Sequence, residues 1–230
     1  MKTFKLLSIA IIAMFAIAAL PVLAEDAAKP PVTKNLKIML TADAGLTKDA
    51  AGKVADWTSQ VEPKVKFAQE NAEKQPTFAK DSVNGKPAVS FDGEQDSLMT
   101  AELPKDFVGD VTVFVVWASA VEQKHQGQDG VNNRILSATT VKGSDWETGF
   151  QLTTGSKAVT KSVIATGSYP ARPQLKYLGI GEMVHSDNGT GTGFTMTGDV
   201  AEVLLYNEKL SDADTAAVTK YLQAKYKIAQ

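Results

Sequence analysis

Short apolar runs separated by turn residues recur along most of this chain, with no helical pattern between them. The strongest run, residues 111–118 (VTVFVVWA), is apolar at nearly every position, so we expect a central strand with both faces covered. Asn84-Gly85 is typical of a tight hairpin turn. This series predicts an all-β antiparallel sandwich. The main expected strands are residues 36–40, 87–91, 111–118, 135–138, 149–153, 162–165, 178–182 and 200–206.

The last apolar pattern of the chain has helical spacing. Ser211 is a suitable N-cap, and Asp212 and Asp214 follow it in the first turn, where acids favour the helix dipole. Apolar residues that include Val218 and Leu222 then recur on one side. We therefore predict a C-terminal helix that docks on the sandwich through this stripe.

The first 24 residues combine a positive start, an apolar run and small residues before Ala24. This pattern is typical of a secretory signal peptide. The alternative, a membrane anchor, requires about 20 strongly apolar residues. We expect a signal peptide at 1–24, a polar linker at 25–34 and one domain at 35–230. The mature protein is then secreted, periplasmic or displayed at the cell surface, without membrane insertion.

Composition excludes several classes of function. The chain has 24 basic and 26 acidic residues and a formal net charge of −2, which disfavours nucleic acid as a partner. It has no cysteine, so disulfides, thiolate nucleophiles and cysteine-ligated zinc are excluded.

Three blocks in order carry a family resemblance: residues 40–60 (LTADAGLTKDAAGKVADWTSQ), 75–98 (QPTFAKDSVNGKPAVSFDGEQDSL) and 198–228 (GDVAEVLLYNEKLSDADTAAVTKYLQAKYKI). Together they resemble the concanavalin A-like lectin/glucanase superfamily, in the laminin-G-like branch of secreted bacterial proteins. The resemblance implies a jelly-roll sandwich of two antiparallel sheets with a C-terminal α-helix. Such folds host lectins, hydrolases, adhesion modules and structural pieces, so function must be argued from the site.

Glycan hydrolysis requires two carboxylates that face one groove. In hydrolases of this superfamily, acids at alternating strand positions supply them, and this chain has no such cluster. Asp199 and Glu202 are three residues apart and are expected on opposite faces of a strand, while Glu94 and Asp96 lie in a turn. We expect these acids to be solvated and predict that the protein is not an enzyme.

Calcium is the metal that the resemblance suggests, since lectins and laminin-G modules often hold it with loop oxygens. Asp92, Glu94 and Asp96 occupy one turn and are the candidate ligands. No cofactor is required by the sequence, and calcium is a possible one.

Sugar binding normally uses an exposed aromatic ring with polar neighbours. Trp146, next to Asp145 in a polar segment, is the best candidate, and Tyr169 is the second. Trp57 and Trp117 lie within strand patterns and are expected in the core. The alternative for Trp146 is a ring folded back over the sandwich.

These observations lead to a secreted, non-catalytic module that binds a glycan or another extracellular surface, such as a protein. Two alternatives stay open: a structural or protein-interaction module of the cell envelope, and a glycan hydrolase with atypical acids.

Overall fold

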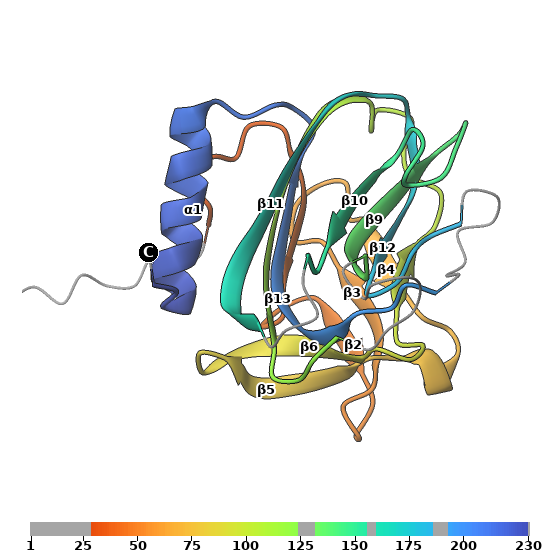
Figure 1. Ribbon diagram of the computed structural model, residues 1–230, viewed down its shortest axis with the longest axis vertical. Helices are drawn as coiled ribbons and strands as arrows, with labels where there is room; N and C mark the ends of the chain where they lie inside the picture. Colours follow the sequence, from red (N-terminus) through yellow and green to blue (C-terminus); the bar gives the residue numbers. More distant parts are fainter. Residues whose placement is uncertain (1–28, 124–131, 156–159, 186–192, 230) are drawn as a thin grey trace, which may run out of the picture.

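The computed structural model describes residues 29–123, 132–155, 160–185 and 193–229, and the expected signal peptide lies outside them. Within these residues, two antiparallel sheets pack face to face and one α-helix lies against the outside of one sheet (Figure 1). The predicted all-β sandwich with a C-terminal helix is therefore confirmed. None of the described helices is long and apolar enough to cross a membrane.

Sheet A has the strand order β11-β8-β13-β6-β5, with β1 paired beside β13. Its strands are β1 (Leu36–Thr41), β5 (Thr77–Val83), β6 (Lys86–Asp92), β8 (Gly109–Ser119), β11 (Thr160–Arg172) and β13 (Thr197–Tyr206).

Sheet B has the order β10-β9-β12-β7-β4-β3-β2. Its strands are β2 (Leu46–Lys48), β3 (Val54–Thr58), β4 (Lys66–Ala68), β7 (Leu98–Thr100), β9 (Arg134–Thr140), β10 (Phe150–Thr153) and β12 (Leu175–Ile180).

Strand β8 has both faces buried, as its apolar sequence predicts. Val113, Val115 and Trp117 belong to the core between the two sheets. Phe114 and Val116 belong to a second core between sheet A and the helix. Because β8 lies between β11 and β13, it is a central strand.

The predicted hairpin and helix start also form as expected. Asn84 and Gly85 have φ angles of 51° and 79° between β5 and β6, the left-handed geometry that an Asn-Gly turn adopts readily. The helix α1 (Asp212–Tyr226) begins at Ser211, whose hydroxyl oxygen accepts a hydrogen bond from the Asp214 N–H. Its predicted stripe is buried against sheet A through residues that include Val218 and Leu222.

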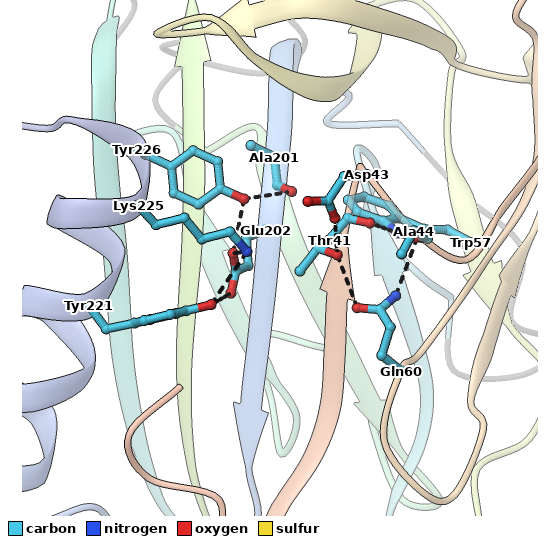
Figure 2. A network of polar contacts seen from close by, with 10 residues as sticks. All are labelled: Thr41, Asp43, Ala44, Trp57, Gln60, Ala201, Glu202, Tyr221, Lys225 and Tyr226. Carbon is cyan, nitrogen blue, oxygen red and sulfur yellow. Dashed lines mark hydrogen bonds and ion pairs between the residues drawn. The ribbon is translucent and has the colours of Figure 1, made fainter. Parts of the chain in front are cut away.

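A buried polar network joins α1 to β13 (Figure 2). The Glu202 carboxylate accepts hydrogen bonds from Lys225 at 2.6 Å, Tyr226 at 2.9 Å and Tyr221 at 3.3 Å. The expectation that Glu202 is solvated is wrong, since its residue exposure is 1%. The simple alternation used to place Glu202 also fails, because the β13–β8 register shifts between Val200 and Glu202.

Several strand boundaries differ from the expected ones. Strand β11 runs from Thr160 to Arg172, well beyond the expected 162–165, and includes Pro170. Proline is tolerated there because β11 is an edge strand of sheet A. The three-residue strands β2, β4 and β7 are too short to show a sequence period of their own.

Candidate functional site

The outer face of sheet B carries a groove of about 800 Å³ over β4 and β7, called here the sheet B groove. Phe67 and Leu98 point into the core, so their strand neighbours Ala68 and Met99 point outward and line the groove. Exposed Ala101 continues this lining beyond the end of β7. The groove thus has an apolar stretch of floor made of small or flexible side chains.

Polar groups gather at the Glu182 end of this groove. Glu182 is 9% exposed, and its Oε1 atom accepts a hydrogen bond from the Gly193 N–H at 2.8 Å. The Gln69 amide donates to the Ser97 hydroxyl at 3.1 Å, and Ser97 in turn bonds Glu182. Burial raises the pKa of Glu182 above its usual value. These contacts hold a carboxyl group at the edge of a ligand-sized groove.

A second hollow of about 320 Å³, the Trp146 pocket, opens on the same side of the molecule. Gln151 points into it from β10, since the neighbouring Phe150 and Leu152 are in the core. Trp146 is 57% exposed at this pocket, in a tight turn where the Ser144 carbonyl accepts three backbone N–H groups. The pocket is lined by Asn132, Arg134, Trp146, Gln151, Met183 and Phe194.

Asp145, the residue before Trp146, forms a buried ion pair with Arg134. Arg134 Nε and Asp145 Oδ2 are 2.8 Å apart, and the two side chains are 5% and 0% exposed. The guanidinium also donates to the Asn132 carbonyl and lies 4.8 Å from the centre of the Phe194 ring. Because every side of Arg134 is engaged, the wall of the pocket is preorganised.

Phe194 adopts a backbone conformation that bulky residues rarely adopt. Its φ angle is 56°, in the left-handed region, and its carbonyl accepts a hydrogen bond from the Arg134 N–H at 2.8 Å. Strain of this kind persists only where surrounding contacts enforce it, and it concentrates at functional sites. Here it places the aromatic ring over the Arg134 guanidinium.

Gln151, which lines the pocket, carries a buried acceptor without a partner among the described residues. Within the described part of the chain, its Oε1 atom is buried and has no hydrogen-bond partner. Such a group is costly unless a ligand or water completes its bonding. A ligand hydroxyl or amide N–H is the complementary donor.

The three predicted ligand-binding residues do not meet at one point. Trp146 is exposed and lines the pocket, whereas Asp145 is buried and forms an ion pair with Arg134. Tyr169 is half-buried on β11, stacked on Phe150 with ring centres 4.6 Å apart, and donates to the Gln151 carbonyl at 2.7 Å. Burial raises the pKa of Tyr169 to about 12. We conclude that Tyr169 joins the two sheets.

The predicted calcium ligands form a self-bonded turn. Asp92 Oδ1 accepts the backbone N–H groups of Glu94, Gln95 and Asp96 at 2.8, 3.2 and 3.3 Å. Asp96 is 4% exposed, so its expected solvation is wrong, and burial raises its pKa to about 6. Among the described residues, no group of three or more acids or histidines is placed to hold a metal ion. The calcium site stays a prediction.

A third hollow, of about 720 Å³, lies beside α1 on the sheet A side. Its polar groups already bond one another (Figure 2). The Thr41 hydroxyl lies 2.5 Å from Asp43 and 3.2 Å from Gln60, and Lys225 is paired with Glu202. None of the described residues that line this hollow is aromatic, in contrast to the Trp146 pocket.

Sequence reasoning missed most of the pocket. Gln151 lies in the expected strand 149–153 and Arg134 directly precedes the expected strand 135–138, but a strand pattern does not distinguish a polar residue that lines a pocket from one that faces bulk water. Glu182 is the last residue of the expected strand 178–182, and Phe194 lies outside the expected strands, so neither was singled out. The polar stretch around Trp146 was the usable signal.

No protein-family model and no curated protein matches the chain. Similar solved structures include a Trypanosoma rangeli sialidase in complex with 2,3-difluoro-KDN, at 14% identity and a TM-score of 0.49. A second structure of Trypanosoma rangeli sialidase gives 13% identity and a TM-score of 0.38. Each match covers 84% of this chain and 33% of the other, so this chain spans about a third of the length of those proteins.

These neighbours correct one prediction. The chain was expected not to be an enzyme because paired acids are absent from its strands, yet both neighbours are sialidases, which are enzymes. The expectation is therefore withdrawn. At these identities and TM-scores the likeness carries no argument about which reaction, if any, this chain performs.

Proposed function

We propose that this protein is an extracellular carbohydrate-binding domain of the concanavalin A-like, laminin-G-like type. In this proposal the Trp146 pocket holds one sugar ring, and the chain reaches the outside of the cell through its N-terminal signal peptide. Binding is the part of the function that a lectin and a glycan-processing enzyme share.

The observation that carries the proposal is the exposed Trp146 beside a rigid polar wall. Of the large apolar side chains exposed in the described residues, Trp146 is the aromatic one. An aromatic face packs against the apolar face of a pyranose ring, and nearby amides bond the hydroxyl groups. The side-chain amide of Gln151 lines the pocket beside Trp146.

The test measures retention on immobilised neutral polysaccharides and glycan arrays, followed by calorimetry on the best ligand. Trp146→Ala should weaken binding at least about tenfold, because the stacking surface is lost. Val141→Ala is the matched control, since Val141 is also exposed but does not line the pocket.

Equal binding by Trp146→Ala and wild type would contradict the proposal. Failure of every glycan to bind, with and without calcium, would favour the alternative of a structural or protein-interaction module of the cell envelope.

A further inference from the structure

The sheet B groove and the Trp146 pocket are lined by neighbouring residues of the segment after β12. Glu182 lines the groove and the next residue, Met183, lines the pocket. Consecutive Cα atoms are about 3.8 Å apart, so the linings of the two hollows come close to each other at this segment. Both volumes, about 320 and 800 Å³, fall within the range of ligand sites.

The formal charges that line the two hollows cancel. In the pocket, Arg134 is already neutralised by Asp145. In the groove, three basic residues face three acidic ones. These are Lys64, Lys66, Lys74, Glu70, Glu102 and Glu182. A strongly charged ligand therefore gains no net attraction at either hollow.

The groove lining is also suited to sugar rings linked in a row. Its floor offers apolar contact through Ala68, Met99 and Ala101, and amide and hydroxyl groups lie beside it on Gln69 and Ser97. This alternation of apolar surface and hydrogen-bonding groups matches the two faces and the edge of a pyranose.

We propose that the ligand is an uncharged linear glycan chain, which places one ring in the Trp146 pocket and continues past Met183 and Glu182 into the sheet B groove. This inference rests on the proposed function and deepens it. The pocket provides the anchoring contact, and the groove makes affinity depend on chain length.

The experiment measures the affinities of disaccharides and hexasaccharides of the cello-, laminari-, manno- and xylo-series by calorimetry. Wild type should bind the hexasaccharide of its preferred series roughly tenfold more tightly than the disaccharide. Ala101→Trp fills the groove from an exposed position and should reduce this ratio to below about threefold, because hexasaccharide binding is weakened. Glu102→Trp gives a second obstruction if the first variant folds poorly.

Ala216→Trp is the matched control, because it makes the same change at an exposed position on α1. It should leave the affinities for both lengths unchanged.

Equal wild-type affinities for disaccharide and hexasaccharide would overturn the chain-length inference, and the proposed function would survive if Trp146→Ala still abolished binding. Tighter binding of hexagalacturonate than of every neutral hexasaccharide would overturn the claim of an uncharged ligand. If wild type bound none of these glycans, the proposed function itself would be contradicted.

Discussion

Among the described residues, each sheet of the sandwich has a buried salt bridge near its outer face, and the two salt bridges have different surroundings. Glu202 of β13 pairs with Lys225 of α1, and their side-chain exposures are 1% and 10% (Figure 2). Arg134 and Asp145 are equally buried, but the residue next to Asp145 is the exposed Trp146. In the first case the pair fixes a helix on a sheet that is closed on both sides. In the second it makes an open surface rigid.

The comparison teaches that buried charge alone does not mark a functional site. Taking two charges out of water is costly, and the cost is offset only when geometry and additional hydrogen bonds are good. Glu202 has all its partners within the protein. The sheet B face differs because the Trp146 ring is exposed beside its pair, in a pocket that the Gln151 side chain also lines.

The largest expected effect comes from breaking the sheet A pair. Glu202→Ala should lower the free energy of unfolding by about 3–5 kcal/mol, because the Lys225 ammonium is left buried without its partner. Urea denaturation followed by circular dichroism measures this change. Lys225→Met in the same chain should recover most of the loss, and Trp146→Ala should change stability by less than about 0.5 kcal/mol. A loss below about 1 kcal/mol for Glu202→Ala would show that the pair does not hold the helix.

A smaller, pH-dependent effect is expected at the turn that links β6 of sheet A to β7 of sheet B. Burial raises the pKa of Asp96 to about 6, above its value of 3.8 in the unfolded chain. Between these values the folded state binds more protons than the unfolded state, so stability falls as pH rises through the window. The free energy of unfolding of Asp96→Asn, relative to that of wild type, should therefore rise by about 1 kcal/mol as the pH increases from about 4 to about 7.5.

Chemical denaturation at the two pH values checks this expectation, with Asp81→Asn as a control at an exposed carboxylate on β5, away from this turn. An identical pH profile for Asp96→Asn and wild type would contradict it. A calcium-dependent gain in wild-type stability at neutral pH would instead support the calcium site predicted from the sequence.

Local patterns predicted much of the sandwich. Strand β8, the Asn84-Gly85 turn and the Ser211 cap each depend on neighbours within a few residues, and the structure confirms them. The burial of Trp57 and Trp117 is likewise confirmed. These features needed no knowledge of which strands pair.

The rest depends on long-range placement. In the sequence, Glu202 resembles an ordinary polar strand residue. In the structure it is buried, because the register shifts next to it and because Lys225, distant in the sequence, pairs with it. Arg134 meets Phe194 only because the segment after β12 returns to the start of β9. Trp146 could be identified because its polar surroundings disfavour burial, whereas its supporting residues carry no such local signal.

The central claim, that the open face of sheet B binds sugar through Trp146, is tested most directly by acrylamide quenching of tryptophan fluorescence. Trp57 and Trp117 are 0% and 2% exposed, so quenching in the free protein should report Trp146. A saturating neutral hexasaccharide should protect this quenchable emission, and Trp146→Phe should lack it. A glycan that binds by calorimetry while leaving acrylamide quenching unchanged would contradict the account.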